Sequence, residues 1–268
     1  MAPLLARACI LGAMLGGCEL FVGIPDVTLA TDGAVDSAVD GDVGACGTHP
    51  GPTMVRVDAL LGSYCIDTTE VTVSQFNAFI IATGGSLAGT PPVCTQAVVT
   101  PPVDNLPQDQ SLPVSDLGEC HAIAYCQWAG KRLCGAIGTG GSTIGVEPRD
   151  TEWTYACING VHNLAYPYGS TFDPQACNID TAGPVPVASE PACKGTVAPY
   201  DQIFDMVGNV SEFQNDLGDG TSVGAEGGAY TTPVSDASAG GCAFQKGFNG
   251  VLFDFPESGF RCCADLPP

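Results

Sequence analysis

The alternation of hydrophobic and polar positions predicts two short strands near the start of the folded part of the chain. Residues 54–57 read Met-Val-Arg-Val, and residues 64–67 read Tyr-Cys-Ile-Asp. Alternation of this kind is typical of strands with one buried face, and the connection between the two segments is short enough for a hairpin. We therefore expect the domain to open with a β-hairpin.

Helical periodicity follows the predicted hairpin. Residues 72–75, Thr-Val-Ser-Gln, supply a capping box, and the apolar positions after it run to a stop at Gly84. A second helix is expected from about residue 115 to 129, ended by Gly130, and a third at residues 152–157. Short helices and strands with long irregular connections predict a loop-rich α+β fold.

Residues 205–213, Asp-Met-Val-Gly-Asn-Val-Ser-Glu-Phe, follow neither period and are interpreted as a loop. The carboxylates of Asp205 and Glu212 bracket a glycine and an asparagine, two residues that favour turns. Side-chain oxygens and inward-facing carbonyls could converge there on a hard cation such as Ca²⁺. The alternative is a tight turn whose acidic side chains face water.

Composition makes metal cations better partners than nucleic acids. The 268 residues include 29 acidic side chains and only eight Lys and Arg, for a net charge of −21. Phosphates of nucleic acids and of anionic membrane surfaces would be repelled by this charge. The 35 glycines and 21 prolines predict much irregular backbone.

The N-terminus is typical of a bacterial lipoprotein signal. Arg7 precedes an apolar run over residues 8–15, and the lipobox Leu-Gly-Gly-Cys ends at Cys18. We interpret residues 1–18 as this signal, with Cys18 lipidated and the protein extracytoplasmic. An ordinary signal peptide cleaved nearby is the alternative, and the apolar run is too short to span a bilayer in either case.

The signal is followed by a predicted tether and then by the folded domain. Residues 31–42 are small or acidic and include no aromatic residue, so we interpret residues 19–45 as a flexible acidic tether rather than calcium-binding repeats. The domain is placed at residues 46–268. Setting aside Cys9 and Cys18, the 14 cysteines leave an even number, which suits complete pairing in an oxidising compartment.

A specific family resemblance emerges at residues 124–133, Ala-Tyr-Cys-Gln-Trp-Ala-Gly-Lys-Arg-Leu. This string closely resembles the most recognisable motif of the formylglycine-generating enzyme family, the sulfatase-modifying factor domain. Further family motifs are Glu-Val-Thr at 70–72, the loop at 205–213, Gly-Gly-Ala-Tyr at 227–230 and Gly-Phe-Arg-Cys at 259–262. The resemblance spans about residues 50 to 265 and implies a disulfide-cross-linked variant of the C-type-lectin-like α+β fold.

The resemblance implies a chemistry whose ligands this chain lacks. Family enzymes convert a cysteine of a sulfatase into formylglycine with O₂ and a Cu(I) ion held by two thiolates. The family register puts Thr232 and Ala237 at those two positions. A threonine oxygen is a poor ligand for Cu(I) and alanine offers none, so we expect neither copper nor the family's catalysis. The alternative is that other thiols have moved into the site.

Disulfide pairs are also implied. The family pairing carries over as Cys126–Cys262 and Cys157–Cys242. Cys262 and Cys263 lie on opposite faces of a strand and need different partners, so we suggest Cys134 for Cys263. The remaining suggestion is a local pair, Cys177–Cys193. The pairing of four cysteines stays open: Cys46, Cys65, Cys94 and Cys120.

Two calcium sites are implied as well. The ligands of the first, by resemblance, are the side chains of Asp205 and Glu212 and the backbone carbonyls of Gly208 and Val210. A second family site begins at an Asn-Ile pair, and its later acidic ligand lies in a segment that is shortened here. Its residues would be Asn178, Ile179 and, as a substitute for the acidic ligand, Asp180.

Two functions remain open. The preferred hypothesis is a non-catalytic binding or scaffold protein, lipid-anchored and calcium-supported, whose partner is a protein, a peptide or a cell-surface glycan. The alternative is an oxidoreductase of the formylglycine-generating class that oxidises a protein cysteine with O₂ through a rearranged site.

Overall fold

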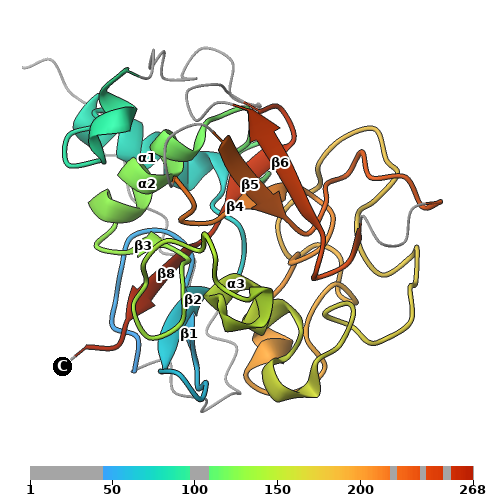
Figure 1. Ribbon diagram of the computed structural model, residues 1–268. Coiled ribbons are helices and arrows are strands. Elements are labelled where there is room, and N and C mark those ends of the chain that lie inside the picture. Colours follow the sequence, from blue (N-terminus) through green and yellow to red (C-terminus); the bar gives the residue numbers. More distant parts are fainter. Residues whose placement is uncertain (1–44, 97–108, 218–221, 236–239, 250–254, 268) are drawn as a thin grey trace, which may run out of the picture. The chain divides into compact units, whose positions relative to one another are not determined.

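The computed structural model of the protein (Figure 1) describes residues 45–96, 109–217, 222–235, 240–249 and 255–267. All of them lie in the second of the two units into which the chain divides, Asp40–Pro268. The predicted signal with Cys18 and nearly all of the predicted tether lie outside the described residues, as does Ala237. In the part that is described, no helix has the length and apolar character needed to cross a membrane.

The first sheet contains the predicted hairpin. Strands β1 (Met54–Val57) and β2 (Tyr64–Asp67) pair antiparallel, which confirms that prediction. Strand β8 (Cys262–Asp265) pairs with β2, and β3 (Arg132–Leu133) completes the order β1-β2-β8-β3. Strand β8 thus pairs with a strand almost 200 residues before it in the sequence, a long-range contact that local patterns do not reveal.

The second sheet corrects the interpretation of residues 205–213 as a loop throughout. Ser211–Phe213 form strand β4, which lies between β5 (Ser222–Glu226) and β7 (Ser258–Phe260), and β6 (Gln245–Asn249) completes the order β6-β5-β4-β7. Pairing of β4 is antiparallel with β5 and parallel with β7. Three residues are too few for an alternating pattern, so this strand depends on partners distant in sequence.

The helices follow the local signals closely. Helix α1 (Val73–Thr83) has the predicted capping box at Thr72, and its C-cap Gly84 is left-handed (φ 68°). Helix α2 begins later than expected, at Glu119, because Gly118 is extended and acts as the N-cap. The ranges of α2, α3 and the 3₁₀ helices of the described residues are Glu119–Trp128, Glu152–Cys157, Pro92–Gln96, Pro148–Asp150, Gly160–His162 and Tyr200–Gln202.

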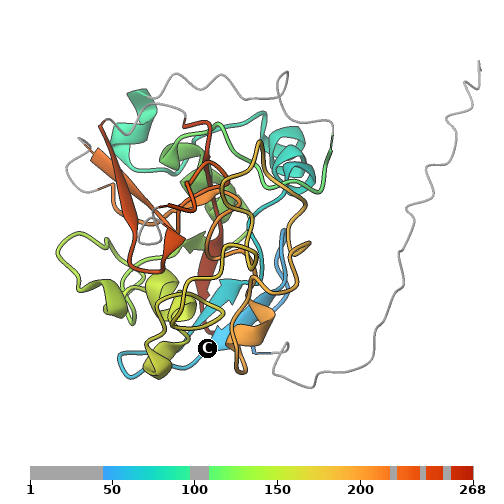
Figure 2. The same cartoon turned by 90° about the vertical axis from the view of Figure 1, so that its right-hand side faces the viewer.

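Long irregular connections join these elements, above all between α3 and β4, where the chain has only short 3₁₀ turns (Figure 2). The core lies in separate buried clusters. One packs α1 and α2 around the aromatic rings of Phe76, Tyr125 and Phe260. Another surrounds Trp153 of α3, which is fully buried. The fold class is therefore α+β and loop-rich, as expected.

Six disulfides cross-link the described residues and use every cysteine among them. The four expected pairs are present, and the two that the sequence left open follow from the structure. The pairs are Cys46–Cys65, Cys94–Cys120, Cys126–Cys262, Cys134–Cys263, Cys157–Cys242 and Cys177–Cys193. So many buried disulfides indicate folding in an oxidising, extracytoplasmic compartment.

Candidate functional site

The loop before β4 has a backbone that its sequence makes possible. Asp205 (φ 57°), Gly208 (φ 75°) and Asn209 (φ 54°) are all left-handed, a conformation that glycine and asparagine tolerate best. A Cβ on residue 208 would also lie 2.6 Å from the carbonyl oxygen of Asn178 and 2.8 Å from Cγ2 of Ile179. Glycine is therefore required here both by conformation and by close packing.

Hydrogen bonds fix this loop to two other segments. The Asn209 Oδ1 accepts from the side chain of Asn178 at 3.1 Å and from the backbone N–H of Val185 at 2.9 Å. The N–H of Gly208 donates to the carbonyl of Gly227 at 3.1 Å. These contacts hold the loop against the Gly-Gly turn that precedes residue 232.

Glu212 holds a buried guanidinium. Its Oε2 accepts from Arg261 Nε at 2.6 Å and from Trp153 Nε1 at 2.8 Å, and its Oε1 accepts from Arg261 Nη2 at 2.7 Å. Arg261 is fully buried and also donates to the carbonyls of Asp67 and Phe204. Each carboxylate oxygen has two lone pairs, so Oε2 is saturated by its two donors and Oε1 retains one acceptor position.

Two further carboxyl groups lie near this ion pair. Glu70 is fully buried, and apart from an interaction with the side chain of Asn209 neither of its oxygens has a hydrogen-bond partner among the described residues. Burial, with the nearby carboxylates of Asp205 and Glu212, raises the pKa of Glu70 well above its usual range. Burial also raises the pKa of Asp205 to about 6. Three carboxylates therefore face one guanidinium, Arg261.

Sequence reasoning did not assign a role to Glu70 or Arg261. Both belong to motifs that carried the family resemblance, Glu-Val-Thr and Gly-Phe-Arg-Cys. Their meeting at Glu212 depends on chain segments far apart in sequence. An available signal was the scarcity of cations: with only eight Lys and Arg in the chain, an arginine between a phenylalanine and two cysteines points to a buried partner of opposite charge.

The distances between these carboxylates limit how many of them one calcium ion can contact. Two oxygens on opposite sides of one Ca²⁺ are separated by about 4.8 Å, since each bond is about 2.4 Å long. Among the described residues, Glu70, Asp205 and Glu212 do not form a set with all three oxygens within 4.8 Å of one another. An ion bound to the carboxylates as they stand would contact at most two of them.

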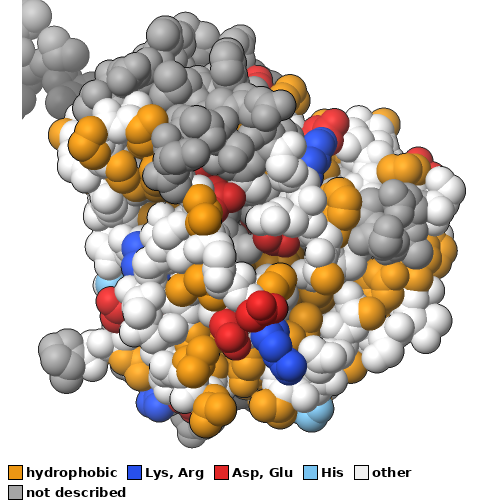
Figure 3. All heavy atoms as spheres, viewed as in Figure 1, with side chains coloured by type: hydrophobic (Ala, Val, Ile, Leu, Met, Phe, Trp, Pro, Cys, Tyr) orange, Lys and Arg blue, Asp and Glu red, His pale blue; other side chains and the backbone are white. Residues whose placement is uncertain are grey.

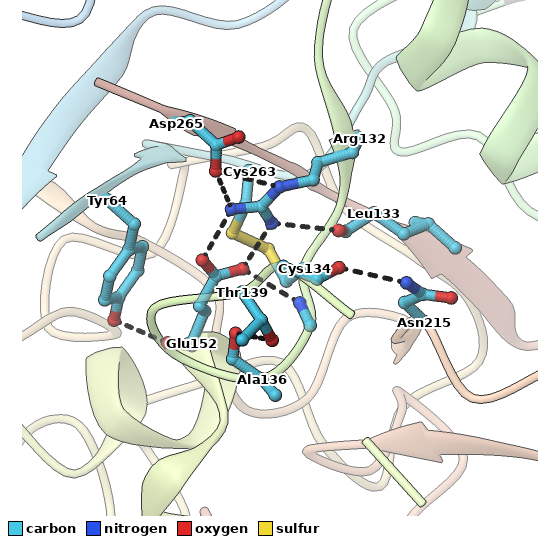
Figure 4. Close-up of polar contacts among 12 residues, drawn as sticks. Tyr64, Arg132, Leu133, Cys134, Ala136, Thr139, Glu152, Asn215, Cys263 and Asp265 are labelled. Carbon is cyan, nitrogen blue, oxygen red and sulfur yellow. Dashed lines mark hydrogen bonds and ion pairs between the residues drawn. A yellow bond between two sulfur atoms is a disulfide. The ribbon is translucent and has the colours of Figure 1, made fainter. Parts of the chain in front are cut away.

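Among the described residues, a different group does meet this distance criterion. One ligand atom each of Cys134, Glu152 and Cys263 lies within 4.8 Å of the other two. The two sulfurs, however, form a disulfide, so neither is a thiolate that could bind a metal. Glu152 forms two hydrogen bonds to Arg132, at 2.6 and 2.7 Å, and Arg132 also contacts Asp265 (Figure 4). The group is a structural ion pair beside a cross-link.

The residues of the predicted second calcium site are only partly brought together. Asn178 and Ile179 pack against Gly208 of the first site. The side chain of Asn178 is already engaged: its Nδ2 donates to Gly183 and Asn209, and its Oδ1 accepts from the Thr181 hydroxyl at 2.7 Å. Asp180, in contrast, has an exposed side chain.

Thr232 is the residue that the family register assigned to the first copper thiolate. Its side chain is 8% exposed, and its Oγ1 accepts from the N–H of Ala229 at 2.9 Å. It lines a cavity of about 190 Å³ together with Lys246 and Glu257, which form an ion pair at 3.1 Å. The hydroxyl therefore stabilises the turn. The second position, Ala237, lies outside the described residues.

The fold and the motif-bearing segments together define a domain of the formylglycine-generating-enzyme type. The chain belongs to this family: residues 54–266 match the family model described as sulfatase-modifying factor enzyme 1-like domain. The match covers strands β1 to β8, helices α1 to α3 and the loop before β4.

Known relatives include active and inactive proteins. The formylglycine-generating enzyme of Mus musculus is 32% identical over 115 residues, which cover 39% of this chain and 27% of that enzyme. The inactive C-alpha-formylglycine-generating enzyme 2 of Bos taurus is 29% identical over 122 residues, covering 42% of this chain and 35% of that protein. The aligned part is thus well under half of each relative.

Solved structures show the same fold at low sequence identity. CarF superposes with a TM-score of 0.51 at 18% identity, covering 76% of this chain and 87% of CarF. PvdO from Pseudomonas aeruginosa gives a TM-score of 0.50 at 17% identity, covering 82% of this chain and 91% of PvdO. At such identities the likeness concerns the fold alone.

Proposed function

We propose that this chain is a non-catalytic binding or scaffold domain, stabilised by calcium and attached to a membrane by a lipid on Cys18. The proposal starts from the cysteines. Every cysteine among the described residues is in a disulfide, and the family register assigns Thr232 to the position of a copper thiolate. No thiol of the described part is left to replace the missing pair, which is what a rearranged oxidase site would need.

The observation that supports calcium most strongly is the excess of buried negative charge. If Glu70, Asp205 and Glu212 were all ionised, they would exceed the single guanidinium of Arg261 by two negative charges. Without a cation the cluster favours bound protons instead, as the raised pKa values of Glu70 and Asp205 indicate. Buried charges are costly unless they are paired or coordinate a metal. A divalent cation would balance this cluster. In this proposal it is bound by Asp205 and the free acceptor position of Glu212, with carbonyls of the loop.

Glu70 takes part in this site through its charge. Apart from the Asn209 side chain, its oxygens have no partner among the described residues, so an ion held beside Asp205 would lower the electrostatic cost of ionising Glu70. The loop backbone around Gly208 fits the role because it is held on two sides, by the Asn178 segment and by the turn at Gly227. A preformed loop loses less entropy on binding an ion.

A protein, a peptide or a glycan remains the proposed partner class. Nucleic acid is disfavoured by the net charge of −21. On the face shown in Figure 3, the Lys and Arg side chains of the described residues are few, lie apart from one another, and in places adjoin acidic side chains. A nucleic-acid surface requires a continuous basic patch.

A peptide oxidation assay tests the non-catalytic role. The purified protein would be incubated with copper, O₂ and a sulfatase peptide that contains the target cysteine, with an active family enzyme as positive control. We expect no aldehyde beyond the copper-only blank, and no thiol titratable in the native protein after removal of residues 1–18. Time-dependent aldehyde formation would overturn the proposal in favour of an oxidoreductase with a rearranged site.

A further inference from the structure

A second acidic region lies in a cavity that the calcium proposal does not use. The cavity has a volume of about 340 Å³ and is bounded by residues before α3, the segment after β4, and strands β5 and β6. Its polar lining includes Thr151, Thr154, Gln214, Asp216, Glu226 and Gln245. None of its lining residues is Lys, Arg or His.

Asp216 forms one wall with Glu119 behind it. Glu119 is fully buried, and its Oε1 accepts from the N–H of Asp216 at 3.2 Å. Asp216 Oδ2 accepts from the N–H of Gly224 at 2.6 Å. Glu119 also accepts from the backbone N–H of Leu217 and lies within hydrogen-bonding reach of the Asp216 carboxyl group. Apart from these contacts, Glu119 Oε2 and Asp216 Oδ1 have no donor among the described residues. Burial and the neighbouring carboxylate raise the pKa of Glu119 well above its usual range.

Gln214 provides an independent sign that the cavity takes a hydrogen-bond donor. Its side chain lines the cavity and is 3% exposed, yet its Oε1 has no partner among the described residues. Its amide hydrogen-bonds to the carboxyl group of Glu226, which lines the same cavity. A buried amide oxygen without a donor costs roughly 1–3 kcal/mol, so a donor from a bound group would be favourable.

Geometry favours an extended cationic group over a single metal ion. Glu119, Asp216 and Glu226 do not have three oxygens within 4.8 Å of one another, so no compact set of three carboxylates surrounds one point. The cavity is also far larger than one ion. A guanidinium is planar and carries several N–H donors on different sides, which suits acceptors that are spread around a cavity.

We propose that this cavity binds a guanidinium group, presented by an arginine side chain of a peptide or by a small free guanidino compound. Asp216 and Glu226 would supply the charge, with Glu226 releasing its proton as the cation binds, and Gln214 Oε1 would accept one of the N–H groups. The inference rests on the proposed binding role and names the chemistry of a ligand for it. It is independent of the calcium loop, because none of these residues is a proposed calcium ligand.

Calorimetric titration of the purified protein tests the proposal with matched probes. The probes are agmatine, an arginine-containing peptide with blocked ends, and the same peptide with citrulline, which is similar in shape but uncharged. We expect the arginine peptide to bind and the citrulline peptide to bind at least about tenfold more weakly, the loss expected for one charge-assisted hydrogen bond. Binding of agmatine would show that a guanidinium group is enough for binding. Binding of the arginine peptide but not of agmatine would assign the site to peptide partners.

Variants decide whether the cavity is the site. Glu226→Gln and Gln214→Leu should each weaken arginine-peptide binding by about tenfold or more, whereas Asp109→Asn, an exposed acidic residue elsewhere, should leave it unchanged. If Gln214→Leu fails to fold, Glu226→Gln carries the test alone. Equal binding of the arginine and citrulline peptides, or binding unaffected by Glu226→Gln, would overturn the proposal.

Titrations in excess calcium and in chelator separate this proposal from the calcium loop. Arginine-peptide binding should persist in both conditions. Binding seen only in chelator would mean that an ion occupies the cavity, and it would overturn the guanidinium assignment. Absence of peptide binding, with the unfolding temperature still responsive to calcium, would refute this inference and leave the calcium proposal standing.

Discussion

The pairing of Glu212 with Arg261 changes what a substitution at Glu212 should do. Removing one partner of a buried ion pair leaves the other charge uncompensated, a loss of about 3–5 kcal/mol in the free energy of unfolding. We therefore expect Glu212→Gln to destabilise the protein by about this amount even in chelator, as measured by denaturant unfolding. The exposed Glu147→Gln is the matched control. Equal stability of Glu212→Gln and the unaltered protein in chelator would mean that Glu212 acts only as a calcium ligand.

Substitution of Glu70 should stabilise the calcium-free protein but weaken its binding of calcium. In chelator, Glu70→Gln removes a buried carboxyl group that lies beside the carboxylates of Asp205 and Glu212, so the unfolding temperature should rise. In calcium, the same change removes a charge that attracts the ion, so the apparent calcium affinity should fall, by about tenfold for a loss of 1.4 kcal/mol. An unchanged affinity would remove Glu70 from the site.

At the level of elements, the sequence predicted those helices and strands whose ends and faces are determined by neighbouring residues. The capping box at Thr72 and the stop at Gly84 gave α1 correctly, and alternation gave β1 and β2. Strand β4 was missed because its three residues are defined by β5 and β7. The same limit applies to the site: residues 205–213 were found by their motif, but their contacts with Glu70 and Arg261 arise only from tertiary structure.

The disulfides should contribute to stability according to the loops that they close. Cys126–Cys262 spans 136 residues and joins α2 to β8, whereas Cys46–Cys65 spans 19. Chain entropy predicts that removing the long-range bridge by paired Cys→Ala substitution costs about 2 kcal/mol more than removing the short one. Denaturant unfolding of the two double variants measures this difference. A larger loss from the Cys46–Cys65 variant would contradict the entropic account.

For the molecule as a whole, buried carboxyl groups should make stability depend on pH in an unusual direction. Burial raises the pKa of Asp216 to about 6 and of Glu226 to about 8. A carboxyl group with a raised folded-state pKa stabilises the fold fully below its unfolded pKa and loses this contribution as pH rises through the folded value. In chelator, the unfolding free energy should therefore fall between about pH 5 and pH 8.

Substitution of Glu226 provides the check on this pH dependence. Glu226→Gln cannot ionise, so the variant should be more stable than the unaltered protein at pH 8 and close to it at pH 5. Thermal unfolding at the two pH values measures the effect, with a shift of about 2–4 °C for each kcal/mol in a domain of this size. A constant difference between the proteins at both pH values would argue against a raised pKa at Glu226.

The response of the whole domain to calcium removal tests the central claim most directly. The unfolding temperature of the purified protein would be measured in excess calcium, after chelation, and after return of calcium or magnesium. Binding to the folded state alone contributes about 2.7 kcal/mol at a hundredfold excess over Kd, or about 5–10 °C. We predict that chelation lowers the unfolding temperature by about this amount and that calcium restores it. An unfolding temperature that is the same in calcium and in chelator, with no calcium in the purified protein, would contradict the account.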